Sequence, residues 1–267
     1  MSCGVNAIAH LKRFTRFGFP CKIEDMRIEG RNAVTEAIAA GKTIDKLTVA
    51  KGLKDPASNR VINAARDAGV RVFFKEKDAL DKESKTGRHQ GFIAEVTDFG
   101  YCEVEDILNT AKSKGEDLFV ILLDGVEDPH NMGSILRVAE CAGVHGVIIP
   151  ERRSVSVNDT VVRVSAGAAA HVKVAKAVNL NDVIREFKKD GVKVVAAEVG
   201  GKPVYETDLT GPLALVVGGE DSGVKRLTRE LCDSIVTLPM FGKVNSLNAS
   251  VSCGAVVYEA IRQRNKG

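Results

Sequence analysis

Apolar and polar positions alternate in blocks along the second half of the chain. Short runs that are almost wholly apolar are separated by segments whose apolar residues have helical spacing. Such strands, with helices between them, are typical of a parallel sheet covered on both faces. The predicted strands are 118–123, 144–149, 192–197, 213–217 and 234–238. A last helix is predicted over 247–263, where small residues recur at helical spacing.

The first third of the chain predicts a smaller α/β unit. A helix-like run follows Gly30, and a second helix over 61–68 ends before Gly69, a residue suited to a helix C-terminus. The strands predicted for this unit are 46–49, 70–74 and 92–96. The predicted organisation is a basic N-terminal arm over 1–23, a domain over 24–98, a linker over 99–117 and a second domain over 118–267. The linker includes a short acidic helix over 103–109.

Composition favours a folded, intracellular protein. Apolar residues make up 44% of the 267 residues, enough for a substantial core, and charged residues make up 27%. No run approaches the roughly 20 apolar residues that a membrane-spanning helix needs, and the N-terminus has no secretory pattern. The six cysteines form no CxxC pair, so their spacing disfavours zinc. Cys141 and Cys253 lie in apolar helical runs, where we expect buried thiols in a reduced, cytosolic protein.

Charge is distributed unevenly between the two halves. Residues 1–98 hold 18 Lys and Arg against 13 Asp and Glu, whereas the remainder holds 20 against 22. A basic front part hints at a module that binds a polyanion. Residues 1–23 contain no acidic residue, and basic side chains there are interleaved with phenylalanines. Contact with RNA is one interpretation of this arm; a frayed terminus and an organellar transit peptide are the others.

Three segments of the second half carry polar residues that packing alone does not require. The first, 128–140, opens a helix after a strand; Asn131 is suited to the N-cap, Gly133 permits a close approach, and Arg137 follows. A capped helix with one exposed arginine would explain this first segment equally well.

The second segment, Leu-Val-Val-Gly-Gly-Glu-Asp-Ser-Gly-Val over 215–224, is neither a GxGxxG motif nor a P-loop. It lies where ligands bind in open α/β sheets, although a simple glycine-rich turn is the alternative.

The third segment, 238–250, again runs from a strand through a polar loop into a helix. Asn245, Ser246, Asn248 and Ser250 supply many donors and acceptors, and Ser246 or Asn248 could cap the last helix. Taken in order and spacing, the three segments resemble the signature motifs of the SpoU (TrmH-like) branch of the SPOUT RNA methyltransferases. The matching residues are Asn-Met-Gly-Ser-Ile-Leu-Arg over 131–137, Val-Gly-Gly-Glu-Asp-Ser-Gly-Val over 217–224, and Leu-Pro-Met through Ser-Leu-Asn-Ala-Ser over 238–250.

The preceding region resembles the substrate-binding domain of ribosomal RNA 2′-O-methyltransferases of this branch. Two short segments carry that resemblance: Glu-Gly-Arg-Asn-Ala over 29–33, at the start of the domain, and Gly-Arg-His-Gln-Gly over 87–91, near its end. The resemblance implies a parallel-sheet α/β methyltransferase domain with a trefoil knot, joined to a small N-terminal α/β domain. It further implies a homodimer that uses S-adenosylmethionine and needs no metal.

Residue roles follow from the same resemblance. Arg137 is the expected catalytic residue, and because a guanidinium stays protonated, we interpret it as stabilising the developing 2′-alkoxide and not as a base. The other residues that the resemblance assigns to catalysis are Asn131, Glu220, Asn248 and Ser246. Those assigned to the cofactor are Gly218, Gly219, Leu238, Pro239, Met240, Leu247 and Asn248. In the first domain, Arg31 and Arg88 could contact RNA phosphates, and His89 or Gln90 could contact a base or sugar. Solvated surface charges are an equally good interpretation of Arg31 and Arg88.

The implied reaction is methylation of a ribose 2′-hydroxyl in RNA, with a guanosine of 23S ribosomal RNA as the favoured target. Transfer RNA remains an alternative substrate. A non-catalytic protein for ribosomal RNA binding or ribosome assembly could use the same scaffold, although the complete polar set at 131, 137, 220 and 248 argues against it. A nicotinamide-dependent oxidoreductase is disfavoured because the chain has no GxGxxG motif followed by an acidic ribose ligand.

Overall fold

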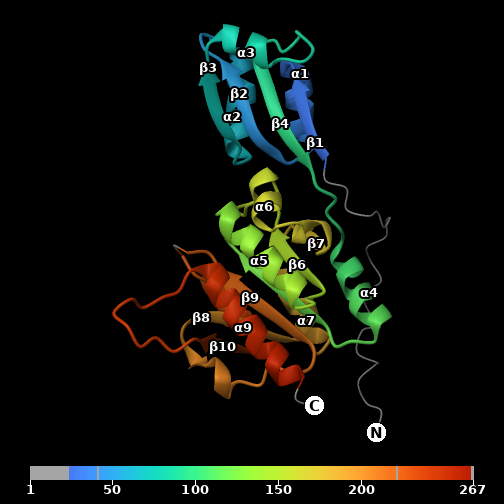
Figure 1. The fold of residues 1–267 in the computed structure, drawn as a ribbon, viewed down its shortest axis with the longest axis vertical. Helices are drawn as coiled ribbons and strands as arrows, with labels where there is room; N and C mark the ends of the chain where they lie inside the picture. The colour runs from blue at the N-terminus through green and yellow to red at the C-terminus, as the bar shows by residue number, and fades with distance from the viewer. Residues whose placement is uncertain (1–23, 41, 221, 266–267) are drawn as a thin grey trace. The chain divides into compact units, whose positions relative to one another are not determined.

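The structure, a computed structural model, describes residues 24–40, 42–220 and 222–265. The described chain forms two compact units: a smaller one built mainly on residues 24–100, and a larger one that holds residues 101–155 and those from 161 onward (Figure 1). The basic arm predicted over 1–23 lies outside the described residues. No helix in the described ranges is long and apolar enough to cross a membrane.

The larger unit is built on a six-stranded sheet in the order β10-β8-β9-β5-β6-β7. All neighbouring strands run parallel, as the apolar runs predicted. β8 lies two places from β5, and β9 then returns to fill the position between them. The strands are β5 (Phe119–Asp124), β6 (Gly146–Pro150), β7 (Val174–Ala177), β8 (Lys193–Pro203), β9 (Leu213–Gly218) and β10 (Ser234–Thr237).

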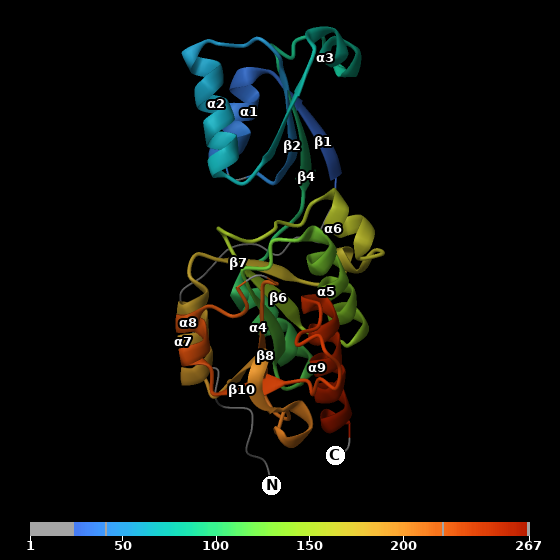
Figure 2. The ribbon, with the colours of Figure 1, turned by 90° about the vertical axis from the view of Figure 1, so that its left-hand side faces the viewer.

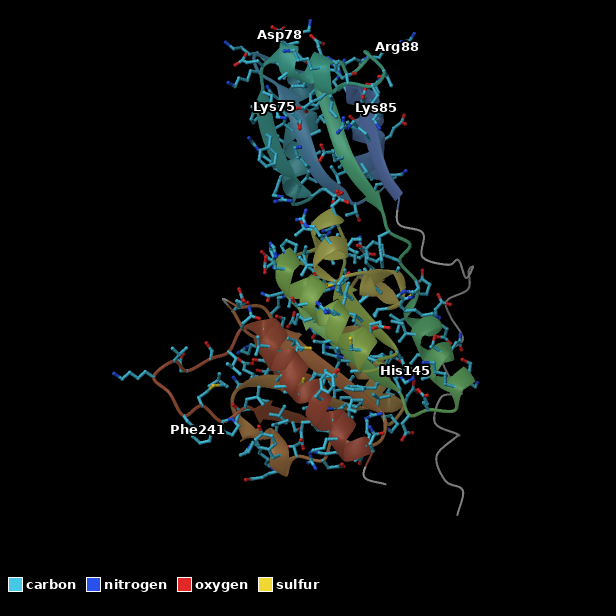
Figure 3. The ribbon with its side chains drawn as sticks, viewed as in Figure 1. Lys75, Asp78, Lys85, Arg88, His145 and Phe241 are labelled. Atoms are coloured by element: carbon cyan, nitrogen blue, oxygen red, sulfur yellow. The ribbon has the colours of Figure 1, made fainter. Side chains whose placement is uncertain are left out.

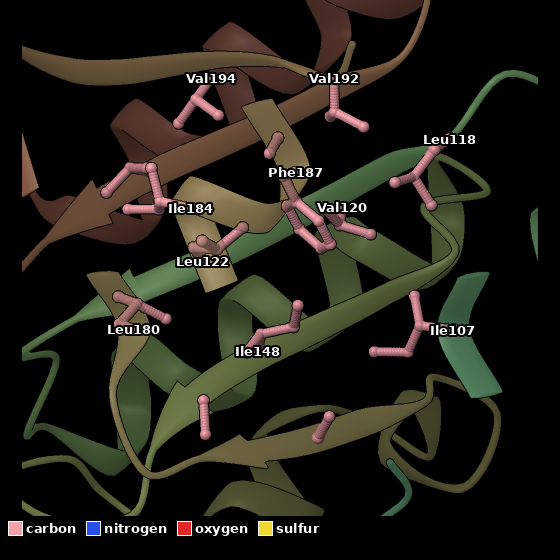
Figure 4. Close-up of a cluster of buried hydrophobic side chains, with 14 of the residues drawn as sticks. Ile107, Leu118, Val120, Leu122, Ile148, Leu180, Ile184, Phe187, Val192 and Val194 are labelled. Carbon is pink, nitrogen blue, oxygen red and sulfur yellow. The ribbon is translucent and has the colours of Figure 1, made fainter. Parts of the chain in front are cut away.

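Helices cover both faces of this sheet. They are α4 (Val104–Lys114), α5 (Pro129–Cys141), α6 (Asp159–Val164), α7 (Leu180–Lys189), α8 (Arg226–Leu231) and α9 (Ala249–Arg264), with short 3₁₀ turns η1 (Ala168–Ala170) and η2 (Val204–Glu206). Figure 2 shows α7 and α8 on one side of the sheet and α5 and α9 on the other. Figure 4 shows the core on the α7 side, where Ile184 and Phe187 meet Val120 and Leu122 of β5.

The segment predicted as a linker contributes to this core. Its helix, α4, is longer than predicted, and it buries Ile107, Leu108 and Ala111 against the larger unit's sheet. Gly146 explains the close packing, because a Cβ there would lie only 2.5 Å from Ile107. The helix therefore belongs to the larger unit structurally.

The smaller unit has a four-stranded sheet in the order β1-β4-β2-β3, in which only β2 and β3 run parallel. Its elements are β1 (Glu24–Glu29), α1 (Arg31–Ala39), β2 (Ile44–Ala50), α2 (Pro56–Asp67), β3 (Arg71–Lys75), α3 (Lys77–Glu83) and β4 (Phe92–Asp98). Phe92, Ala94 and Val96 alternate along β4 and face α1 and α2, whereas Ile93 points the other way, toward Leu80 of α3.

Several expectations need correction. The sequence pattern did not predict β1, β7 and α3. These elements are short or rich in charged residues, so their apolar residues show little periodicity. Cys141 is exposed at the end of α5, whereas burial of Cys253 raises the pKa of its thiol to about 12, so only Cys253 behaves as expected. Asn131 is not an N-cap: α5 begins at Pro129, and the Asp128 carboxylate caps it by accepting from the Asn131 N–H at 3.0 Å.

Candidate active site

The three polar segments of the larger unit meet through their side chains. The Asn131 amide nitrogen donates to Glu220 Oε1 at 2.8 Å, and the Asn248 amide nitrogen donates to the same oxygen at 2.6 Å. Asn248 also donates to Asn131 Oδ1 at 2.9 Å. These residues are 28 to 117 positions apart in sequence, so the fold itself assembles this polar cluster.

Helix capping fixes the orientation of two members of the cluster. Because Asp128 caps α5, the Asn131 side chain is left free to point at Glu220, and it is only 4% exposed. Asn248 is the N-cap of α9, as anticipated, and its Oδ1 accepts from the N–H groups of Ser250 and Val251. That leaves the Asn248 NH₂ group as the donor to the other two side chains.

Glycines allow the Glu220 loop to come close to neighbouring backbone. A Cβ on Gly218 would lie 2.1 Å from the Gly223 carbonyl carbon, and one on Gly219 would lie 2.2 Å from the Gly125 oxygen. No side chain fits at either position without moving the main chain. Similarly, a Cβ on Gly133 would lie 2.9 Å from the Val161 carbonyl oxygen, which explains the close approach of α5 to α6.

Two residues that the sequence analysis did not single out anchor this loop. Asp124, at the end of β5 and only 2% exposed, accepts from the Lys225 backbone N–H at 2.9 Å and pairs with the Lys225 ammonium at 2.8 Å. The Asp124 carbonyl accepts from Gly219 N–H at 3.2 Å. Both ends of the glycine-rich loop are thereby tied to one strand end. The sequence signal was available, since Asp124 directly follows a buried strand.

A cavity of about 510 Å³ opens beside the cluster, at the carboxyl ends of β8, β9 and β10. This is the position where open parallel sheets bind ligands, and its size is within the usual range for small-molecule sites. The cofactor residues expected from the sequence that line it are Gly218, Gly219, Leu238, Met240, Leu247 and Asn248, and Glu220 and Ser246 line it too. Pro239 does not line the cavity; it is exposed, so its expected place in the pocket is not seen.

Arg137 is exposed on α5 and does not line the cavity. Among the described residues, none forms a hydrogen bond or ion pair with it. The Arg137 guanidinium is therefore free to meet a substrate, but the fold of one chain does not join it to the Asn131, Glu220 and Asn248 cluster.

The four residues expected to contact RNA differ in their surroundings. Arg88 is exposed on a loop of the smaller unit (Figure 3), and Arg31 forms a half-exposed ion pair with Asp55 at 3.2 Å. Gln90 is exposed, and its side-chain oxygen accepts from the Arg31 N–H. His89 is 4% exposed, with its Nε2 2.7 Å from Asp81 and its Nδ1 accepting from the Gly91 N–H. His89 is thus a structural residue, and its expected RNA contact is wrong because both ring nitrogens are used inside the fold.

Glu29 holds the loop that presents Arg88. Its carboxylate accepts from Ser84 Oγ and the Lys85 N–H, both at 2.6 Å, and from Thr86. Partial desolvation of Glu29 would raise its pKa, but the hydrogen bonds from Ser84, Thr86 and Lys85 together prevail and lower the pKa to about 2. The loop is therefore fixed by an ionised carboxylate throughout the neutral range.

Comparison with known proteins agrees with this architecture. Residues 118–258 match the SpoU rRNA Methylase family, and residues 27–102 match the RNA 2′-O ribose methyltransferase substrate-binding domain. The chain belongs to the SpoU methylase family. It is 40% identical, over 88% of its length and 95% of the relative's, to the Putative TrmH family tRNA/rRNA methyltransferase YacO of Bacillus subtilis.

Solved structures of this family share the fold. The SpoU methyltransferase AviRb from Streptomyces viridochromogenes, in complex with AdoMet, has a TM-score of 0.59 at 24% identity, covering 91% of this chain and 92% of its own. The A. aeolicus TrmH/SpoU tRNA modifying enzyme has a TM-score of 0.51 at 32% identity, covering 56% of this chain and 76% of its own. The α/β fold with a parallel sheet is thereby shown, and membership of the family makes the chain an RNA methyltransferase.

Proposed function

We propose that this chain transfers the methyl group of S-adenosylmethionine to a ribose 2′-hydroxyl in RNA. The observation that carries the proposal is the cluster of Asn131, Glu220 and Asn248 at the edge of a cavity lined by glycine backbone and by Leu238, Met240 and Leu247. Apolar side chains suit the faces of an adenine, and main-chain groups suit its edges. The cavity therefore fits this cofactor.

The chain's own residues position the acceptor oxygen. S-adenosylmethionine, when bound, supplies a methyl group on a sulfonium that leaves readily. Asn131 and Asn248 hold the Glu220 carboxylate in one orientation, and Ser246 offers a hydroxyl at the cavity mouth. The 2′-oxygen would take the methyl group, the neutral thioether S-adenosylhomocysteine would leave, and the hydroxyl proton would pass to water or an RNA phosphate. Arg137 is proposed to stabilise the negative charge that develops on the 2′-oxygen, since its guanidinium remains protonated and cannot accept the proton.

The substrate we propose is a guanosine in 23S ribosomal RNA. Support comes from the substrate-binding domain over residues 27–102 and from the basic side chains Arg31 and Arg88, which suit phosphate contacts. Transfer RNA is the second candidate, because YacO is described as a tRNA/rRNA methyltransferase and the A. aeolicus relative as a tRNA modifying enzyme. Either reaction belongs to the cytoplasm, where we expect the protein to act. We favour an enzyme over a non-catalytic RNA-binding protein because the polar cluster is complete.

We propose that the working form is a homodimer, with the active site near the subunit interface. Large apolar side chains are exposed on the loop after β10 and on α9: Phe241 is 97% exposed (Figure 3), and Val251 and Tyr258 are each more than half exposed. A second copy over this surface would bury them. Arg137 does not line the cavity of its own chain. In the dimer it would belong to an active site formed by both subunits. The trefoil knot implied by the family resemblance stays a prediction.

The test is transfer of labelled methyl from S-adenosylmethionine into RNA. Total RNA should be taken from cells that lack the chain's own gene, and the 23S, 16S and transfer RNA fractions separated after reaction. Label in 23S RNA is the expected result. Label in transfer RNA would support the proposed reaction but contradict 23S RNA as the proposed substrate. No label in any RNA or ribosomal particle, together with no binding of S-adenosylhomocysteine, would favour the non-catalytic interpretation.

A further inference from the structure

Glu198 lines the cavity from a side to which no role has been assigned. It follows the fully buried residues Val194, Val195 and Ala196 of β8, so it is the first acidic residue beyond the carboxyl end of that buried run. The register between β8 and β10 shifts at this point. Ile235 of β10 pairs with Ala196, but the next residue, Val236, pairs with Lys202. Residues 197–201 therefore bulge out of that ladder, and bulges next to active sites commonly redirect a side chain.

The bulge depends on close backbone packing. A Cβ on Gly201 would lie 2.3 Å from the Ile235 carbonyl oxygen, and Gly200 has a φ of +84°, a conformation that favours glycine. The chain thus keeps two glycines at the point where Glu198 turns into the cavity. On the other side of the carboxylate, a Cβ on Gly223 would lie 2.8 Å from Glu198 Oε1, so the carboxylate rests against the glycine-rich loop.

The Glu198 carboxylate is incompletely satisfied. Its Oε2 atom is buried and has no hydrogen-bond partner among the described residues. Buried carboxylate oxygens are costly unless a donor reaches them, and native structures leave few without one. Because Glu198 lines the cavity, a small turn of its carboxylate would bring this oxygen to a bound molecule, which is the natural source of the donor.

The geometry of the site narrows the choice of donor. In the proposed reaction the cluster of Asn131, Glu220 and Asn248 faces the RNA. Glu198 comes from β8, which supplies no member of that cluster and pairs with β9 next to Gly218. Two carboxylate oxygens match two adjacent hydroxyl donors, and in other nucleotide-binding α/β sheets an acidic residue after a strand holds a ribose. We propose that Glu198 binds the 2′- and 3′-hydroxyls of the cofactor's own ribose. This assignment rests on the proposed use of S-adenosylmethionine.

The first test measures ligand affinity by calorimetry on the full chain. Glu198→Gln and Glu198→Ala should each weaken binding of S-adenosylhomocysteine about tenfold or more, as expected for loss of a hydrogen bond to a charged group. Methylthioadenosine, which has the ribose but no amino acid, should be weakened by a similar factor. The matched control is Glu206→Gln, which makes the same change at an exposed residue outside the cavity and should leave both affinities unchanged.

The second test compares ligands that differ only in their ribose hydroxyls. The unaltered protein should bind 2′-deoxy and 3′-deoxy forms of methylthioadenosine more weakly than methylthioadenosine itself, and in Glu198→Ala this difference should largely disappear. A structural role for Glu198 predicts a lower melting temperature for the unliganded variants; our proposal predicts an equal or higher one, because an unpaired buried carboxylate is removed.

The outcomes separate the two proposals. If the unaltered protein binds neither S-adenosylhomocysteine nor methylthioadenosine, the proposed function fails and Glu198 loses its ligand. If both bind and the Glu198 variants bind them as tightly as the unaltered protein does, only the Glu198 assignment is overturned. Weakening confined to S-adenosylmethionine would also overturn it, because that pattern means the carboxylate faces the sulfonium.

Discussion

The polar residues of the two units are held in contrasting ways. In the larger unit, Asn131, Glu220 and Asn248 come from three distant segments, and each hydrogen-bonds the other two. In the smaller unit, Arg31 is half-exposed in an ion pair with Asp55, and Arg88 is exposed on a loop that Glu29 fixes; no hydrogen bond between the two arginines is among those of the described residues. The first arrangement is suited to chemistry, which needs atoms in one geometry. The second is suited to binding a polyanion through several weak contacts.

This contrast predicts unequal effects of substitution. Residues of an interlocked cluster act as a unit, so losing one should disable the whole. Exposed basic residues act nearly independently, so losing one should remove only its share of RNA affinity. The predictions below run from the largest expected effect to the smallest.

Gly218→Ala should abolish cofactor binding and transfer. Its Cβ would fall 2.1 Å from the Gly223 carbonyl carbon, so the loop that lines the cavity must move. Calorimetry with S-adenosylhomocysteine measures the effect. Gly254→Ala in α9 is the matched control, since a Cβ there makes an ordinary 3.5 Å contact with Val138. Normal binding by Gly218→Ala would show that the loop is not the rigid part of the site.

Arg137→Ala should lower the transfer rate by about 10²- to 10³-fold, the usual cost of losing a group that stabilises developing charge. Affinity for S-adenosylhomocysteine should not change, because Arg137 does not line the cavity. Arg185→Ala, which removes another exposed arginine of the same unit, should retain full activity. Near-normal turnover by Arg137→Ala would remove it from the catalytic set.

Arg88→Ala should weaken RNA binding only a few-fold while leaving the rate at saturating RNA unchanged. If Arg88 contacts a phosphate, the slope of log affinity against log salt should fall by about 1. Arg66→Ala, at the exposed end of α2, serves as the control for charge alone. A large loss of rate at saturating RNA would mean that the smaller unit takes part in the chemistry.

Mild acid should destabilise the larger unit through His145. Burial lowers the pKa of His145 below its usual 6.5, although its bond to Glu116 opposes this; Nδ1 accepts from the Phe119 N–H and so must be unprotonated. The unfolded chain then binds the extra proton more readily, so stability falls as pH drops below about 6.5 toward the folded pKa. Melting temperatures at pH 7.5 and 5.5 should differ less for His145→Gln than for the unaltered protein or for His171→Gln, at an exposed position.

Much of the site was predictable because parallel strands bring their carboxyl ends to one edge. That rule marked 215–224 as a ligand-binding turn, helical spacing located α9, and the family resemblance joined this turn to 128–140 and 238–250. It could not place β9 between β8 and β5, since strand order depends on which helices pack where. His89 looked like an RNA contact because its burial depends on Asp81, which lies on a helix that the sequence pattern did not reveal. Glu198 went unnoticed although it directly follows a predicted buried strand.

The central claim, that the polar cluster directs methylation to a ribose oxygen, is tested most directly by the position of the transferred methyl. RNA labelled by the protein should be hydrolysed with alkali, which cleaves at every free 2′-hydroxyl. The account predicts that the label remains in alkali-resistant dinucleotides. Label recovered in mononucleotides, on a base, would contradict it and would require a different role for Asn131, Glu220 and Asn248.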